Sequence, residues 1–211
     1  MTGQDRRQFG VRPAGAHAVL LDLPNQESVH DLAQWLLHAP ERDLIEDVVP
    51  GARTVLVVAR RGVNALMAML STYSPPAQVA SDASRVAHIP VVYDGPDLDD
   101  VCSTLNIDRA QFAAAHSGAV HMVAFFGFTP GFAYITGLPR ALHVPRRANP
   151  RTRIPAGSVA IANGYTVIYP GDTPGGWNLV GHTVAEPLWD TSREPPNRLS
   201  LGDRILFRGP E

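Results

Sequence analysis

Five arginines lie within 14 positions in the second half of the chain, and their chemistry suggests a site for anions. Each guanidinium is a planar fork that can bind a carboxylate or a phosphate through two parallel hydrogen bonds. A solvated loop whose arginines keep the turns soluble is the alternative. The five residues are Arg140, Arg146, Arg147, Arg151 and Arg153.

Aromatic residues around these arginines favour the anion site. Eight of the 15 aromatic residues lie between positions 125 and 177, and pockets for small anions combine such apolar walls with a few polar groups. Single-stranded nucleic acid also binds arginines and aromatics, but the net charge of −2 argues against it. The eight are Phe125, Phe126, Phe128, Phe132, Tyr134, Tyr165, Tyr169 and Trp177.

Candidate proton carriers and nucleophiles are few. His116 lies at the end of a predicted helix, and the five-residue spacing to His121 matches no established metal-binding pattern, so a core or capping role stands beside a catalytic one. Ser158 follows a turn at the mouth of a predicted strand, where a serine is more often structural than nucleophilic. Cys102 lies within a predicted helix and is assigned to packing or to the surface.

Residue types that are missing exclude several classes of enzyme. All 18 basic residues are arginine, so this chain has no lysine for a Schiff base, a phosphate loop or an attached biotin. No HExxH, paired CxxC or GxSxG motif occurs, and we expect no metal site. The single cysteine is compatible with a reducing compartment, and we expect a cytoplasmic protein.

Neither export nor a membrane span is expected. Residues 5–9 (DRRQF) resemble a twin-arginine signal, but the apolar stretch that follows is cut short by Asp22 and Pro24. Residues 110–139 carry no charged side chain, yet histidines, glycines and a proline interrupt them. We interpret this segment as buried core.

The first part of the chain predicts alternating strands and a pair of helices. The clearest helix begins with Ser28 as its N-cap, carries an apolar stripe to Leu37 and ends before Pro40. The complete order, βαββαβ, is that of the ferredoxin-like unit. The expected elements are a strand over 17–23, this helix, a hairpin of strands 44–49 and 54–59, a helix over 63–70 and a strand over 84–93.

The second part predicts two short helices and then a β-barrel. The helices cover 97–105 and 109–116, with Asp108 as N-cap of the second and Gly118 near its C-terminus. Residues 127–181 contain 9 Gly and 7 Pro, which is typical of short strands joined by turns, including a type II turn at 173–176. The predicted fold class is α+β, with domains 1–87 and 88–211 and protease-sensitive chain between Ser74 and Arg85. The expected strands are 122–128, 158–162, 166–169, 178–184 and 203–207.

A series of motifs in the second part resembles a known family. The motifs lie at 127–134 (GFTPGFAY), 137–139 (GLP), 145–147 (PRR), 150–151 (PR), 155–162 (PAGSVAIA), 169–170 (YP) and 174–177 (PGGW). With them, the chain is similar to allophanate hydrolase subunit 1, a family that includes the B subunit of 5-oxoprolinase and the sporulation-kinase inhibitor. The resemblance implies a ferredoxin-like N-terminal domain and a cyclophilin-like β-barrel, with subunit 2 of the hydrolase or the C subunit of the oxoprolinase as partner in a carboxyltransferase-type module.

Two positions depart from the family pattern. The chain has Asn163-Gly164-Tyr165-Thr166 where the family reads Gly-Gly-Gln-Thr. It has Gly181-His182-Thr183-Val184 where the family reads Gly-Arg-Thr-Pro. A long amide and a cation are therefore absent near the motif core, which concerns the substrate rather than the fold.

The resemblance implies a subunit of an ATP-dependent 5-oxoprolinase, which opens 5-oxoproline to glutamate. Arg146, Arg147 and Arg151, with Ser158, would bind the anionic substrate, while His116 and Tyr134 would handle protons. ATP would be bound by the assembled complex, and any biotin would be on another chain. A urea or allophanate module and a non-enzymatic inhibitor of a histidine kinase are the alternatives.

The same residues predict that this chain is half of a site. It lacks a phosphate loop, a lysine and an evident nucleophile, so we expect no activity from the chain alone. Residues 125–147 have the apolar, aromatic and arginine composition of an interface with a carboxyltransferase-like subunit, and a further lactam-hydrolase subunit is a second candidate partner. Replacing Arg146 and Arg151 by alanine is expected to lower activity with little change in stability.

Overall fold

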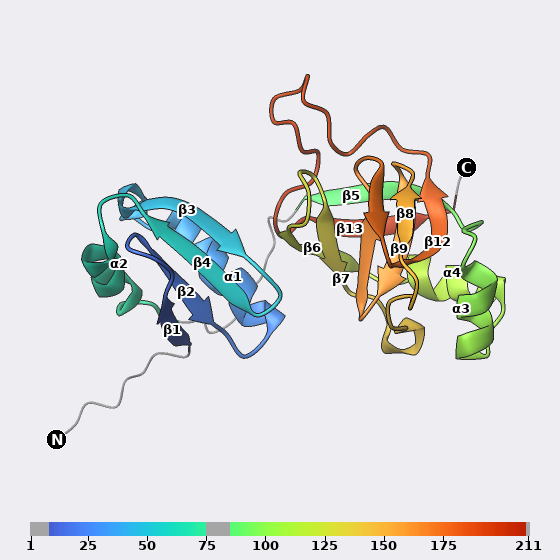
Figure 1. Ribbon diagram of the computed structural model, residues 1–211, viewed down its shortest axis with the longest axis horizontal. Coiled ribbons are helices and arrows are strands. Elements are labelled where there is room, and N and C mark those ends of the chain that lie inside the picture. Colours follow the sequence, from blue (N-terminus) through green and yellow to red (C-terminus); the bar gives the residue numbers. More distant parts are fainter. Residues whose placement is uncertain (1–8, 75–84, 210–211) are drawn as a thin grey trace. The chain divides into compact units, whose positions relative to one another are not determined.

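The computed structural model describes residues 9–74 and 85–209, which fall into two compact units, 1–82 and 83–211 (Figure 1). The boundary, and with it the segment expected to be protease-sensitive, lies within 75–84, outside the described residues. None of the helices in the described ranges is long and apolar enough to cross a membrane.

The first unit is one antiparallel sheet with two helices. Its strand order is β1-β2-β4-β3, and α1 contacts β3 and β4. The elements are β1 (Gly10–Pro13), β2 (Ala18–Asp22), α1 (Gln26–His38), the short 3₁₀ helix η1 (Arg42–Leu44), β3 (Ile45–Pro50), β4 (Thr54–Ala59) and α2 (Val63–Leu70).

This arrangement corrects the predicted βαββαβ order. The described elements of the unit run ββαββα, because the fourth strand of the sheet is β1, at its edge beside β2, and not the strand expected at 84–93. That strand is β5 (Val86–Val92), which pairs in the second unit. β1 contains a glycine and a proline, residues that weaken a strand signal in the sequence.

The structure confirms the apolar stripe predicted for helix α1, but the N-cap of the helix lies three residues earlier than predicted. Asn25, not Ser28, is the N-cap, and its side-chain oxygen accepts a hydrogen bond of 2.8 Å from the Ser28 amide. The helix buries its stripe against the sheet, and its C-cap, Ala39, directly precedes Pro40. The buried residues of the stripe are Val29, Leu32, Ala33 and Leu36.

The second unit contains a closed barrel of seven strands in the order β10-β7-β6-β13-β5-β12-β9. Two short helices, α3 (Leu98–Leu105) and α4 (Arg109–Ser117), pack on it, and Asp108 and Gln111 form the capping box of α4. The remaining elements are β6 (His121–Phe126), β7 (Ala133–Thr136), the 3₁₀ helix η2 (Arg140–Leu142), β8 (Arg151–Ile154), β9 (Ser158–Ala162), β10 (Tyr165–Ile168), β11 (Thr173–Gly175), β12 (Asn178–Thr183) and β13 (Arg204–Arg208).

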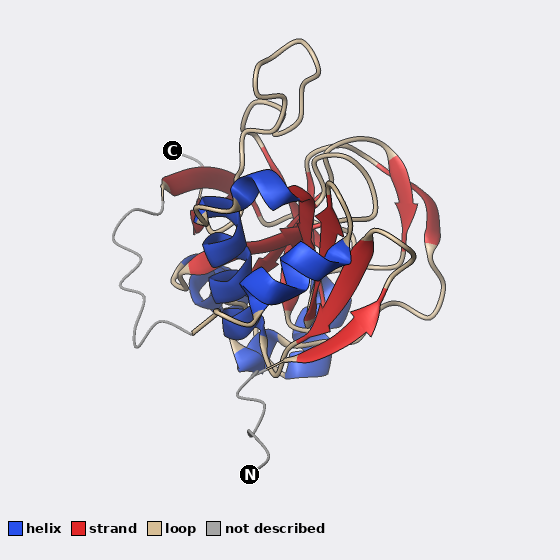
Figure 2. Ribbon diagram, turned by 90° about the vertical axis from the view of Figure 1, so that its left-hand side faces the viewer, coloured by secondary structure: helices blue, strands red, loops and turns tan. Residues whose placement is uncertain are grey.

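Two segments of this unit differ from a simple barrel of turns and strands. Residues 173–175, expected in a type II turn, form β11, which pairs with β8 in a separate two-stranded ribbon. The connection from β12 to β13 is a long loop that projects beyond the barrel in both views (Figures 1 and 2).

The barrel wall has apolar residues on both faces, because successive side chains of a strand point to opposite sides. In β9, Val159 and Ile161 belong to the main core, to which all seven strands contribute. Ala160 and Ala162 belong to a second cluster on the outer face, which the residue Ile154 of the ribbon helps to cover. The wall therefore separates two environments for functional side chains.

A close backbone crossing positions the start of α3. A Cβ atom on Gly95 would lie 2.3 Å from the carbonyl oxygen of Leu179 and 2.4 Å from the carbonyl carbon of Val180. Next to this crossing, the Asp97 amide donates to the Leu179 carbonyl at 3.1 Å. Only glycine fits here without a backbone shift.

We therefore expect Gly95→Ala to destabilise the protein by about 1–3 kcal/mol, as over-packing does at sites that cannot relax. Gly171→Ala is the matched control, because a Cβ there would meet nothing within 4 Å. Urea unfolding measures both. Equal stability of the two variants would contradict the close approach of Gly95 to the backbone of β12.

Candidate functional site

The aromatic residues predicted to surround the arginines gather on the outer face of the barrel wall. Tyr134 is central, since its ring stacks on Phe125 at 4.4 Å and meets Phe132 edge-on at 5.3 Å. Phe126 belongs instead with the main core. We call the set Phe125, Phe132, Tyr134, Tyr165, Tyr169 and Trp177 the outer aromatic cluster.

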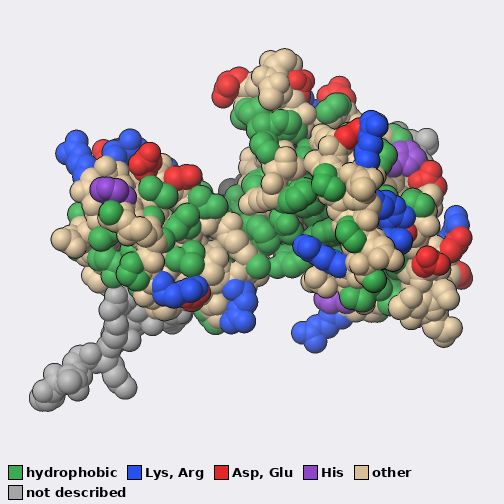
Figure 3. Space-filling model, in the orientation of Figure 1, with side chains coloured by type: hydrophobic (Ala, Val, Ile, Leu, Met, Phe, Trp, Pro, Cys, Tyr) green, Lys and Arg blue, Asp and Glu red, His purple; other side chains and the backbone are tan. Residues whose placement is uncertain are grey.

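One part of the surface of this unit is apolar. Hydrophobic side chains gather over its β6–β7 side (Figure 3). Tyr134 and Tyr165 remain partly exposed, whereas Phe132, Tyr169 and Trp177 are almost completely buried. The cluster thus offers two phenol rings to a ligand above a closed apolar base.

Arg146 lies beside this cluster. Its guanidinium carbon is 5.3 Å from the centre of the Trp177 ring, within the range of a cation–π contact. The residue is exposed. A cation held over an aromatic face with its donors open to solvent is suited to bind a carboxylate or a phosphate.

Arg147 and Arg151 have a different partner, which the sequence did not reveal. Arg151 binds Asp97 through two hydrogen bonds of 2.8 Å, and Arg147 makes an ion pair with the same carboxylate. Asp97 is only 2% exposed and also accepts a 2.8 Å hydrogen bond from the Leu179 amide. Two of the three predicted anion-binding arginines therefore hold an internal carboxylate.

The charge state of Asp97 follows from these contacts. Burial alone would raise the pKa of its carboxyl group, but the hydrogen bonds from Arg151 and Leu179 and the charges of Arg151 and Arg147 outweigh it and lower the pKa. The carboxylate is therefore ionised at neutral pH. An aspartate at a helix start is normally expected to cap its own helix, so no local signal indicated this role.

His116 and Tyr134 lie on opposite faces of the barrel wall. Thr166 Oγ1 is 3.0 Å from His116 Nε2, whereas the next residue along β10, Val167, pairs with Tyr134. Neighbouring residues of a strand point to opposite faces, so the two predicted proton carriers do not meet. The structure therefore does not bring these two side chains into one site.

The surroundings of His116 are those of a core residue. Its side chain is completely buried, and the Tyr93 hydroxyl is 2.8 Å from Nδ1, so both ring nitrogens have partners within the chain. Burial, and to a smaller extent the charge of His121, lower the pKa of His116 to about 3. The ring is therefore neutral at pH 7.

The other predicted residues are scattered. Ser158 is buried at the start of β9, opposite His182 of β12. Arg153 pairs with Asp172, and Arg140 lies exposed in η2. Ser158 meets the outer aromatic cluster through its backbone alone, since its carbonyl accepts a 3.0 Å hydrogen bond from the Tyr169 amide, and neither arginine has a described contact to the cluster.

The two departures from the family pattern lie in different places. Tyr165 is part of the outer aromatic cluster, 5.9 Å from Tyr134, and burial raises the pKa of its phenol. His182 Nδ1 lies 2.8 Å from the Asp94 carboxylate at the surface. Tyr165 is therefore part of the wall of the candidate site, whereas His182 is not part of the outer aromatic cluster.

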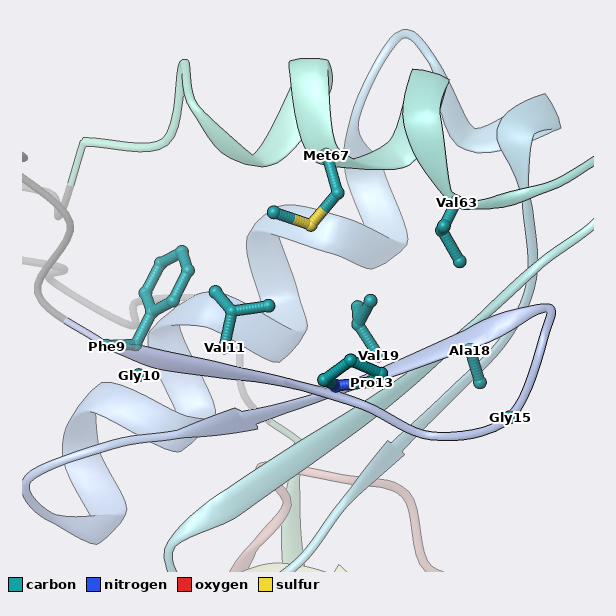
Figure 4. Close-up of a pocket in the computed structure, with 9 residues that line it drawn as sticks. All are labelled: Phe9, Gly10, Val11, Pro13, Gly15, Ala18, Val19, Val63 and Met67. Atoms are coloured by element: carbon teal, nitrogen blue, oxygen red, sulfur yellow. The ribbon is translucent and has the colours of Figure 1, made fainter.

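Other candidate sites offer fewer reactive or charged side chains. In the part of the chain that the structure describes, no group of three or more His, Cys, Asp or Glu could hold a metal ion. A cavity of about 550 Å³ lies in the first unit between β1, β2 and α2 (Figure 4). Its lining carries no charged side chain and consists of Phe9, Gly10, Val11, Pro13, Gly15, Ala18, Val19, Val63 and Met67.

Comparison with known proteins agrees with this fold. The B subunit of 5-oxoprolinase from Escherichia coli O157:H7 is 38% identical over 205 residues, 92% of each chain. The crystal structure of TTHA0988 superposes with a TM-score of 0.79 at 34% identity and covers 92% of this chain, which spans only 40% of that one. The urea amidolyase of K. lactis has the same fold, with a TM-score of 0.72 at 19% identity over 96% of this chain and 15% of its own.

The family match extends over both units. The family model of the carboxyltransferase domain, subdomain C and D, matches residues 9–199. Because this match covers most of the sequence and agrees with the bacterial relative, the chain belongs to the family of carboxyltransferase domains, subdomains C and D.

Proposed function

We propose that this chain is a subunit of an ATP-dependent 5-oxoprolinase, which opens the lactam ring of 5-oxoproline to give glutamate. The observation that carries the proposal is the 38% identity to the B subunit of a 5-oxoprolinase over 92% of each chain. The exposed Arg146 on Trp177, whose ring also meets that of Tyr134, supports it, because 5-oxoproline is a small carboxylate.

The low reactivity of a lactam explains why the reaction would use ATP. A five-membered lactam is a poor electrophile, so its carbonyl oxygen would be phosphorylated, with ADP as the leaving group. Water would then add to the carbonyl carbon, and cleavage of the C–N bond would leave an acyl phosphate. A second water would hydrolyse this to glutamate and phosphate.

This chain supplies binding groups for the substrate. Arg146 would hold the carboxylate, and the rings of Tyr134 and Tyr165 would form the wall beside it. Arg147 and Arg151 would add a net positive field, since two guanidinium groups share one carboxylate. The Tyr134 hydroxyl would hold a proton at the reacting group, and ATP would bind in the assembled complex.

Arg146→Ala is expected to lower the 5-oxoproline-dependent ATP hydrolysis of the co-expressed complex at least ten-fold, which corresponds to about 1.4 kcal/mol. Arg208→Ala, an exposed arginine at the end of β13, is the matched control and should leave the rate unchanged. The measurement is the rate of ATP hydrolysis by the complex with 5-oxoproline, with urea or with allophanate, and by the chain alone.

Four outcomes would contradict the proposal. Full activity of the Arg146→Ala complex would remove Arg146 from the site. Turnover by the isolated chain would exclude a shared site. Biotin-dependent carboxylation of urea in place of lactam hydrolysis, or inhibition of a histidine kinase without any turnover, would favour the respective alternative function.

A further inference from the structure

Phe128 combines an exposed aromatic ring with an unfavourable backbone conformation. Its side chain is 65% exposed, and its φ angle is +70°. Among the described residues, the other two non-glycine residues with positive φ are Asn106 and Asn163. Asparagine tolerates this region, whereas a phenylalanine is strained there.

The loop that carries Phe128 is held firmly. The Gly127 amide donates to the Phe132 carbonyl at 3.2 Å, and the Phe132 amide donates to the Thr129 carbonyl at 3.0 Å. Gly131 is packed so tightly on Trp189 that a Cβ there would lie 2.6 Å from the Trp189 Cβ. The strained conformation is therefore imposed by contacts on both sides of the loop.

The Phe128 ring also packs on a buried residue. It meets the buried Phe132 edge-on at 5.3 Å, which connects it to the outer aromatic cluster. Most of the Phe128 ring nevertheless faces solvent, where it contributes little to folding. Strain that folding does not require points to a function of the residue.

We propose that Phe128 is the aromatic anchor with which this chain binds the second, carboxyltransferase-like subunit of the complex. The inference rests on the proposed function, which requires such a subunit. Rigid aromatic residues that enter a pocket of the partner contribute most of the binding energy at many interfaces. The exposed ring of Phe128 is apolar, so the matching pocket of the partner would be apolar as well.

The comparisons support a protein as the occupant. In TTHA0988 the matching region is only 40% of the chain, so further polypeptide accompanies this fold there. The E. coli relative is named as one lettered subunit of 5-oxoprolinase, a name that implies other subunits. A protein surface therefore fits an exposed aromatic anchor on this chain.

Phe128→Asn tests the proposal, because asparagine removes the ring and tolerates the backbone conformation. We expect its affinity for the carboxyltransferase-like subunit of the same organism to fall at least ten-fold, measured by calorimetry without substrate. The melting temperature of the isolated chain should stay the same or rise. Phe128→Ala should lose the same affinity, and Val120→Asn, at another exposed apolar residue, should lose none.

Three results would contradict the proposal that Phe128 binds the second subunit. The first is unchanged affinity of both Phe128 variants for that subunit, and the second is an equal loss of affinity in Val120→Asn. The third is that the unmodified chain forms no complex with the subunit. A lower melting temperature of both Phe128 variants would show that the ring packs on this chain, and loss of self-association would show that it binds a second copy. A complex that depends on Phe128 but does not hydrolyse 5-oxoproline would retain the anchor and refute the proposed function.

Discussion

Asp97→Ala is expected to lower the free energy of unfolding of the barrel unit by about 3–5 kcal/mol, the loss found when one partner of a buried ion pair is removed. Arg147 and Arg151 would lose their shared carboxylate, and the Leu179 amide would lose its acceptor. The two guanidinium groups are only 29% and 28% exposed, so water replaces the carboxylate poorly. Denaturant unfolding followed by tryptophan fluorescence measures the change.

Two variants calibrate this expectation. Asp99→Ala removes the partner of Arg109 at the surface, where both side chains are exposed, and should change stability little. Asp97→Asn keeps the shape and removes the charge, so its stability should lie between that of the parent and that of Asp97→Ala. If Asp97→Ala and Asp99→Ala were equally stable, the internal ion pair would contribute nothing to stability.

The ion pair also changes an expectation from the sequence. The sequence alone predicts that Arg151→Ala leaves stability almost unchanged, but this variant would leave the buried Asp97 with one cation fewer. We now expect it to be destabilised. Arg146, which the structure places over Trp177, remains the better test of ligand binding.

Acidification from pH 7.5 to 4.5 is expected to cost the barrel unit about 3 kcal/mol through His116, since a group contributes about 1.4 kcal/mol per pH unit between its two pKa values. In the folded state burial lowers the pKa of His116 to about 3, whereas an unfolded histidine titrates near 6.5. The unfolded state therefore binds more protons below pH 6.5. Stability is complete above that pH and is lost as the pH falls towards 3.

Other groups act in the same direction but can be separated. Burial also lowers the pKa of His121 beside it and of His30 in the first unit. The lowered pKa of Asp97 removes stability only below about pH 4, since its ordinary value is 3.8. The window from pH 6.5 to 4.5 therefore reports on the buried histidines.

His116→Gln identifies the contribution of one ring. Glutamine can still hydrogen-bond to Tyr93 and Thr166 but does not titrate, so the variant should be less stable at pH 7.5 and show a shallower loss below pH 6.5. Unfolding free energies of the parent and of this variant, measured at intervals of half a pH unit, test this expectation. Parallel curves for the two proteins would refute the assignment.

Local pattern was sufficient for most helices and strands. The apolar spacing of 63–70 and the Asp108 cap correctly predicted α2 and α4, because helix periodicity and capping depend on residues within one or two turns. The end of the first sheet was predicted wrongly. A strand over 84–93 was correct as a strand, but its partners, β12 and β13, lie about a hundred residues further along the chain. Pairing over that distance leaves no trace in local periodicity.

For the site, the sequence by itself determined the family motifs and the concentration of arginine and aromatic residues. Only the tertiary structure decided how they combine. Asp97 reaches Arg147 and Arg151 across 50 and 54 residues, and its own neighbourhood resembles an ordinary helix start. The wall of the barrel separates His116 from Tyr134, because strand register determines which side chains share a face. Composition fixes which chemical groups are available, and the pairing of distant strands fixes which of them can act together.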